Sequence, residues 1–232
     1  MPEPSIAQRL QAIKQRIHLA ETNYHRPLGS VQLLAVSKGQ DATAIEQAYE
    51  GGQRDFGENY VQEALIKIRS LSHLDLQWHF IGPIQSNKTK IIATEFSWVH
   101  SLCRLTIAQQ LHAARNPSLP RLNVCLQVNL DEEDSKSGVA CHLLPELAQA
   151  VLQLPRLQLR GLMTIPAPQI DTQRQYHSLL RLSNLLHSLN SDLNLSLDTL
   201  SMGMSDDLDA AIHAGSTIVR IGKAIFGERT PH

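Results

Sequence analysis

Paired cysteines are missing from this chain of 232 residues. It contains three, Cys103, Cys125 and Cys141, and no two of them have the C-x-x-C spacing. An odd number without that spacing argues against a disulfide framework and against a zinc site. Because such unpaired thiols are typical of a reducing compartment, the sequence predicts a cytoplasmic protein.

An excess of charge of either sign is also missing. Lys and Arg total 21, Asp and Glu total 22, and the net charge is −1. Such a balance leaves no electrostatic footprint for nucleic acid or an anionic membrane, so we expect neither as a partner. No apolar run approaches the ~18 residues that span a bilayer, and the start, Met1-Pro-Glu-Pro4, lacks the basic and apolar segments of a signal peptide.

What the sequence does contain is a regular alternation of strand and helix patterns. Ser5 and Gln8 form a capping-box pattern that predicts a helix before the first strand. Strands are expected at 31–36, 54–57, 78–82, 97–101, 122–129, 157–165, 197–202 and 217–222, with helices at 42–49, 58–68, 86–93, 105–114, 142–152, 171–189 and 206–214 between them. This alternation, without an interdomain linker, predicts an α/β fold: a single (β/α)8 TIM barrel domain over residues 1–232 with an extra N-terminal helix. A doubly wound open sheet is the alternative.

A lysine follows the first expected strand. Five of the six residues of 31–36 are apolar, as in a strand buried on both faces, and Ser37, Lys38 and Gly39 come next. Because desolvating an ammonium group is costly, Lys38 must lie where the barrel opens onto water or a ligand. It is either a solvated lysine at a strand end or a partly desolvated amine able to form a Schiff base with an aldehyde.

Two glycine-containing loops follow the last two expected strands, at 201–205 and 220–223. In this fold such loops commonly bind phosphate, and Gly203 and Gly222 permit the close backbone approach that this needs. Arg220 lies in an otherwise apolar strand, so its guanidinium must face a buried carboxylate or a ligand atom. A lysine, a phosphate cradle and an arginine around one cavity suit pyridoxal 5′-phosphate (PLP). A sugar-phosphate or aldolase-type barrel is the alternative.

Seven motifs in this order resemble those of one family, the pyridoxal phosphate homeostasis proteins. They are Ala35-Val-Ser-Lys38, Phe56-Gly-Glu-Asn-Tyr60, Trp78-His-Phe-Ile-Gly82 with Gln85-Ser-Asn-Lys88, Ser135-Lys-Ser-Gly138, Arg160-Gly-Leu-Met163, Ser201-Met-Gly-Met-Ser-Asp206 and Val219-Arg-Ile-Gly222. The match covers about 31–227. The resemblance implies a barrel similar to the N-terminal domain of alanine racemase, with PLP attached covalently to Lys38.

The resemblance also implies a set of cofactor-binding residues and no metal site. The set is Lys38, Asn59, His79, Met163, Ser201, Met202, Gly203, Arg220 and Gly222. Within it, Ser201, Gly203 and Gly222 would hold the phosphate, Arg220 would face the pyridine nitrogen, and the pocket would be lined by Asn59, His79 and Met163. Three further basic residues are expected to be solvated rather than in the pocket: Arg121, Lys136 and Lys223.

Two functions remain open, a PLP carrier and a PLP-dependent amino-acid racemase. The resemblance implies the carrier, a monomer that buffers PLP and supplies it to apo-PLP enzymes. A racemase needs a second base opposite the lysine, and the ten residues from Lys223 to His232 leave no room for the added β-domain that supplies one in alanine racemase-like enzymes. An arginine at the pyridine nitrogen also disfavours ring protonation and weakens the ring as an electron sink. We therefore expect no catalytic residue.

Overall fold

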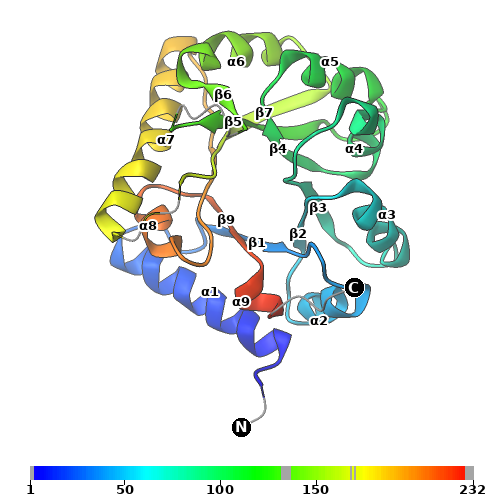
Figure 1. The fold of residues 1–232 in the computed structure, drawn as a ribbon, viewed down its shortest axis with the longest axis vertical. Helices are drawn as coiled ribbons and strands as arrows, with labels where there is room; N and C mark the ends of the chain where they lie inside the picture. The colour runs from blue at the N-terminus through cyan, green and yellow to red at the C-terminus, as the bar shows by residue number, and fades with distance from the viewer. Residues whose placement is uncertain (1–2, 132–136, 168, 170, 228–232) are drawn as a thin grey trace.

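The computed structural model describes residues 3–131, 137–167, 169 and 171–227. Within these ranges, eight parallel strands close into a barrel (Figure 1). They are β1 (Gln32–Val36), β2 (Asp55–Glu58), β3 (Gln77–Phe80), β4 (Trp98–Leu102), β5 (Leu122–Asn129), β7 (Leu157–Met163), β8 (Thr199–Ser201) and β9 (Ile218–Ile221). Because β9 pairs with β1, Gln32 opposite Ile218, the sheet has no free edge. The predicted TIM barrel is confirmed, and the open doubly wound sheet is wrong.

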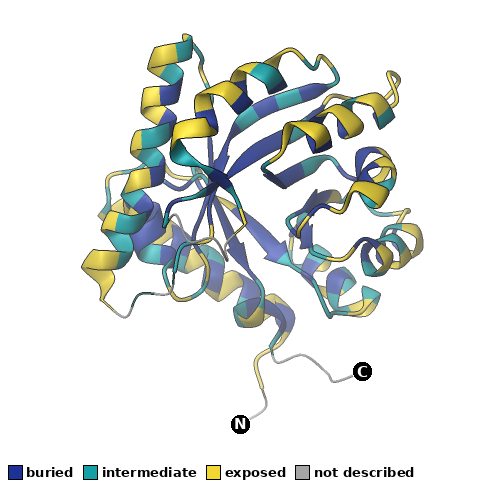
Figure 2. Cartoon of the chain, turned by 45° about the horizontal axis from the view of Figure 1, so that its top comes forward, coloured by how far each residue is buried: buried dark blue, intermediate teal, exposed yellow. Residues whose placement is uncertain are grey.

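Helices cover the outside of the barrel, and each follows a strand. They are α2 (Ala42–Glu50), α3 (Val61–Ser70), α4 (Thr89–Glu95), α5 (Leu105–Ala114), α6 (Leu144–Leu152), α7 (Thr172–Leu193) and α8 (Leu208–His213). Each turns buried apolar residues toward the strands and exposed ones outward (Figure 2). This two-sided cover explains why the strands are continuous apolar runs rather than alternating ones.

The N-terminal helix α1 (Ile6–Asn23) takes the place that the eighth outer helix holds in a (β/α)8 barrel. It begins at the predicted capping box, in which Gln8 N donates to Ser5 Oγ and Ser5 N to Gln8 Oε1. After β9 the described residues form only the four-residue α9 (Lys223–Phe226), and α1 packs against α2, α8 and α9. The extra helix thus closes the outer ring.

Several observed elements differ from the predicted ones. Strand β8 is shorter than the predicted 197–202, α7 runs on past 189 to Leu193, and α8 starts two residues late, at Leu208. A two-residue strand, β6 (Val139–Ala140), pairs with the end of β5 and is too short for a periodicity to reveal. Within the described parts of the chain, no helix has the length and apolar character needed to cross a bilayer.

Candidate functional site

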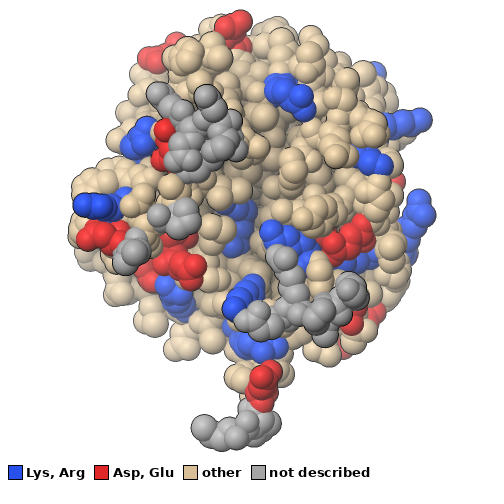
Figure 3. Space-filling view, in the orientation of Figure 1, with Lys and Arg blue, Asp and Glu red and all other residues tan. Residues whose placement is uncertain are grey.

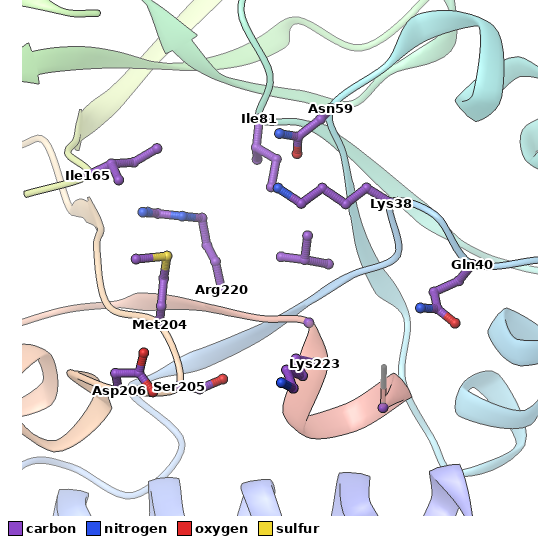
Figure 4. A pocket seen from close by; sticks show the side chains of 13 residues that line it. Lys38, Gln40, Asn59, Ile81, Ile165, Met204, Ser205, Asp206, Arg220 and Lys223 are labelled. Carbon is purple, nitrogen blue, oxygen red and sulfur yellow. The ribbon is translucent and has the colours of Figure 1, made fainter. Parts of the chain in front are cut away.

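A cavity of about 570 Å³ opens at the C-terminal ends of the strands. Its size is in the range of small-molecule sites. Lys and Arg side chains gather around the hollow at the middle of this face (Figure 3), and Figure 4 shows the residues that line it. They are Val36, Lys38, Gln40, Asn59, Ile81, Ile165, Met204, Ser205, Asp206, Arg220, Gly222, Lys223 and Gly227. Three cationic side chains, Lys38 from the N-terminal part of the sequence and Arg220 and Lys223 from the C-terminal part, thus face the same cavity.

The Lys38 side chain extends from the end of β1 into this cavity (Figure 4). A buried ion-pair network fixes the backbone on both sides of it. Lys67 Nζ on α3 donates to Ser37 O and to Glu58 Oε1, both at 2.7 Å. Glu63 Oε1 accepts from Gly39 N and from Lys67 Nζ, both at 2.5 Å. The network therefore holds the strand exit so that Lys38 points inward.

Burial of the Glu58 carboxylate is the unfavourable part of this network. Its side chain is fully buried, Oε1 accepts from Ser37 Oγ at 2.6 Å, and Oε2 has no partner among the described residues. Burial raises the pKa of Glu58 above its ordinary value even though Lys67 opposes the shift. The ammonium of Lys67 is thus the group that stabilises this carboxylate in the protein interior.

Asn59 presents a buried polar atom that the described protein does not satisfy. Its Oδ1 has no hydrogen-bond partner in the described chain, and its residue lines the cavity beside Lys38. A buried amide oxygen of this kind is usually paired, so it suits a hydrogen-bonding group of a ligand. The backbone of Asn59 packs directly on Gly82, where an added Cβ would lie 2.1 Å from Asn59 O. That close approach explains the glycine after β3.

Arg220 brings a buried guanidinium to the cavity wall. Its Nη1 donates to Ser201 O at 2.6 Å and to Ser201 Oγ at 2.9 Å, and Nη2 donates to Thr164 O at 2.9 Å. No described carboxylate forms an ion pair with it, so the neutral oxygens of Ser201 and Thr164 are its hydrogen-bond partners among the described residues. Burial lowers the pKa of Arg220 to about 10, which leaves the side chain cationic at neutral pH.

The cavity lining includes four of the nine predicted residues: Lys38, Asn59, Arg220 and Gly222. The other five are buried in the barrel wall or interior, outside the described lining: His79, Met163, Ser201, Met202 and Gly203. The Ser201 hydroxyl bonds His100 and Arg220. Gly203 has φ +99°, and an added Cβ there would lie 2.5 Å from Ala211 Cβ, so this position packs the loop after β8 against α8.

Sequence reasoning missed several lining residues. Lys223 is exposed, as expected, and it also lines the cavity from the first turn after Gly222, which the prediction had given less weight. Three further lining residues, Met204, Ser205 and Asp206, lie in the motif Ser201-Met-Gly-Met-Ser-Asp206. Their position directly after β8 is the signal that could have identified them. Arg121 lies away from the cavity and donates to Leu157 O, while Lys136 lies outside the described residues.

Two buried histidines behind Arg220 make stability depend on pH. Burial lowers the pKa of His79 from its ordinary 6.5, and burial with the charge of Arg220 lowers that of His100 further. The unfolded chain then binds more protons than the folded one below pH 6.5. We expect the free energy of unfolding to fall as pH drops from 7 to 5, by up to ~1.4 kcal/mol per pH unit per histidine.

Denaturant titrations at pH 5, 6, 7 and 8 measure this slope. His100→Gln should flatten it, whereas His73→Gln, at an exposed position before β3, should leave it unchanged. An equal slope in the wild type and His100→Gln would contradict the assignment.

The barrel is shared with a known class of proteins, those related to the N-terminal domain of alanine racemase. The family model "Alanine racemase, N-terminal domain" matches residues 8–230. Alanine racemase from Corynebacterium glutamicum has the same fold, with a TM-score of 0.69 at 15% identity, covering 96% of this chain and 63% of the racemase. At that identity the likeness extends to the fold alone.

Closer relatives narrow the class. The pyridoxal phosphate homeostasis protein of Pseudomonas aeruginosa is 56% identical over 225 residues, 97% of this chain and 96% of that protein. Its Escherichia coli K12 counterpart is 49% identical over 227 residues, 97% of each chain. The structure of PipY from Synechococcus elongatus PCC7942 with PLP bound has a TM-score of 0.86 at 35% identity and covers 96% of this chain and 100% of PipY. The chain belongs to the pyridoxal phosphate homeostasis proteins.

Proposed function

We propose that residues 1–232 form one domain that binds PLP through a Schiff base on Lys38 and takes part in intracellular PLP homeostasis. The observation that carries this proposal is the placement of Lys38, Arg220 and Lys223 around a cavity of about 570 Å³, with an unpartnered buried acceptor on Asn59. An aldehyde with an anionic phosphate fits that set of groups. The names of the relatives and the PLP-bound PipY support it.

The proposal gives each residue a task. Lys38 supplies the amine, and Arg220 uses the donors not given to Ser201 and Thr164 to face the pyridine nitrogen. Gly222 and Lys223 would hold the phosphate from the cavity wall, and the loop of Ser201 and Gly203 would reach it through the residues that follow, Met204 and Ser205. His79, Met163 and Met202 support this shell from the barrel side. When bound, PLP supplies the reactive aldehyde and an electron-withdrawing ring.

Gly222 tests the phosphate assignment. An added Cβ would lie 3.2 Å from Val36 O, and both residues line the cavity. We expect Gly222→Leu to weaken PLP binding by roughly 1–3 kcal/mol, the size of a lost charge-assisted contact. Binding of pyridoxal, which has no phosphate, should change little. Fluorescence titrations of both ligands measure the difference, and equal weakening would place the phosphate elsewhere.

The same proposal makes the protein a carrier that does not turn over amino acids at an enzyme's rate. A permanent cation at the pyridine nitrogen disfavours ring protonation, so carbanion chemistry gains little from the ring. None of the three cysteines forms a disulfide with another described residue, in keeping with the cytoplasm as the compartment in which a monomer would pass PLP to apo-PLP enzymes.

Two measurements test the carrier role. We expect the PLP-loaded protein to leave the α-protons of single L-amino acids unexchanged in D₂O, and to restore the activity of an apo-PLP enzyme mixed with it. Exchange at ~1 s⁻¹ or faster, the range of ordinary turnover, would show a racemase-type enzyme instead. Failure to activate any apo-enzyme would remove the delivery role.

A further inference from the structure

A chain of hydrogen bonds crosses the barrel interior from Arg220 to the N-terminal end of the strands. Arg220 Nη1 on β9 lies 2.9 Å from Ser201 Oγ on β8, which lies 2.7 Å from Nδ1 of His100 on β4. His100 Nε2 lies 2.9 Å from Nδ1 of His79 on β3, and His79 Nε2 lies 3.2 Å from Asp55 Oδ1 at the start of β2. Each of five strands contributes one group to this chain.

With both histidines neutral, the carboxylate end of this hydrogen-bonded chain fixes the direction of every bond. The carboxylate of Asp55 can only accept, so His79 carries its proton on Nε2 and donates it to Asp55. His79 Nδ1 is then an acceptor, so His100 carries its proton on Nε2 and donates to it. His100 Nδ1 in turn accepts from the hydroxyl of Ser201, whose oxygen also accepts from the guanidinium of Arg220. The carboxylate therefore requires the same tautomer in both histidines, and the arginine end is compatible with it.

The surroundings support neutral histidines held in one orientation. His79, His100 and Ser201 are fully buried, and burial lowers the pKa of both histidines. The ring of Trp98 stacks on His79 at 5.4 Å between centroids with 4° between the planes. Aligned bonds between a cation and an anion polarise one another in the same sense, which strengthens the chain.

The hydrogen-bonded chain links Arg220 to a carboxylate that does not contact it. Its bonded partners, Ser201 and the carbonyl of Thr164, are neutral, and no carboxylate of the described residues is in contact with it, although the charge of Asp207 acts on it from a distance. A carboxylate in direct contact would hold the guanidinium but would also cancel much of its field at the cavity. Asp55 lies at the other end of the chain, lining a second cavity of about 340 Å³ beside α1. The carboxylate thus anchors the arginine without neutralising it.

We propose that Asp55, His79 and His100 are positioning residues that hold Arg220, through Ser201, in the orientation that faces the cofactor ring. This inference rests on the proposed PLP site. His79, placed in the cofactor pocket by sequence reasoning, acts in this account through Arg220 rather than by touching the ligand.

The ring tautomers of His79 and His100 test the hydrogen-bonded chain directly, in protein without cofactor. Protein labelled with ¹⁵N at histidine is measured by long-range ¹H–¹⁵N correlation at pH 7.5, and His79→Gln and His100→Gln assign the two rings among the 11 histidines. We expect both rings to be neutral with the proton on Nε2. A proton on Nδ1 of either ring, or a charged ring, would overturn the proposal.

Variants of the distant carboxylate test the link to the cofactor. Asp55→Leu removes the last acceptor, and we expect the PLP dissociation rate to rise about fivefold, the effect of one net hydrogen bond, with a shift of the visible absorption band. Asp55→Asn keeps an acceptor oxygen but loses the anion, so its dissociation rate should lie between those of the wild type and Asp55→Leu. Asp75→Asn, an exposed carboxylate at the same end of the barrel, is the control and should be unchanged.

A folded Asp55→Leu with the wild-type rate and spectrum would overturn the proposal. So would an Asp55→Asn as impaired as Asp55→Leu, because the effect would then come from charge and not from the chain. If Asp55→Leu does not fold, the tautomer measurement still decides. Failure of the wild type to bind PLP would instead reject the proposed function.

Discussion

Lys38→Ala is expected to abolish the visible absorption band of the PLP-bound protein completely. The Schiff base needs a primary amine at this point of the cavity. Lys38 supplies it, because hydrogen bonds to the backbone of its two neighbours, Ser37 and Gly39, hold the end of the strand so that Lys38 points into the cavity. The other lysine in the described lining, Lys223, lies on the following turn after β9. Absorption spectra of protein incubated with PLP and freed of excess ligand measure the effect.

Lys38→Arg is the matched control. It keeps a cation of similar length but has no amine that can form the imine, so it should bind PLP without the visible band and separate charge from covalent attachment. Borohydride reduction of the wild type followed by peptide mapping should find the label on Lys38. A label on Lys223 would refute the assignment.

Lys67→Met is expected to reduce the free energy of unfolding by about 3–5 kcal/mol at pH 7, the usual cost of leaving one member of a buried ion pair alone. Glu58, fully buried, would lose its cation, and Ser37 O would lose its donor. Denaturant titration measures the loss. Lys90→Met, on the exposed side of α4, is the control and should change stability little.

The pH dependence of Lys67→Met has a definite sign. Without Lys67 the pKa of Glu58 rises further above its already raised value, so the folded state binds a proton that the unfolded chain does not. The deficit relative to the wild type should therefore shrink as pH falls from 8 to 5. The double variant with Glu58→Gln should recover most of the stability at pH 7. A deficit independent of pH would mean that lost packing, not the stranded carboxylate, destabilises the variant.

The barrel and Lys38 could be predicted because both depend on signals local in sequence. A buried parallel strand is a short apolar run, and a lysine directly after it stands out against that background. Arg220 was found in the same way, as a cation in an apolar strand. These residues are among those that the structure brings to one cavity.

The hydrogen-bonded chain could not be predicted, because its links join strands that are distant in sequence. His79 and His100 each follow a tryptophan within one or two residues, yet nothing local shows that the two rings meet or that Ser201 completes the path. The alternation of inward and outward side chains leaves such pairings open until the register of neighbouring strands is known. For the same reason His79 was assigned to the pocket.

The position of α1 has a consequence for synthesis of the protein. Its apolar face, with Ile6, Leu10 and Ile13, is translated long before two of its packing partners, α8 and α9. Arg16 of α1 donates to Ser205 O in the loop after β8 and Arg9 to Ile225 O in α9, so α1 also braces two segments that border the cavity. Until α8 and α9 emerge from the ribosome, the part of this face that they cover is open to chaperones or aggregation. The cofactor site is therefore completed only when these late segments pack on a helix that was translated well before them.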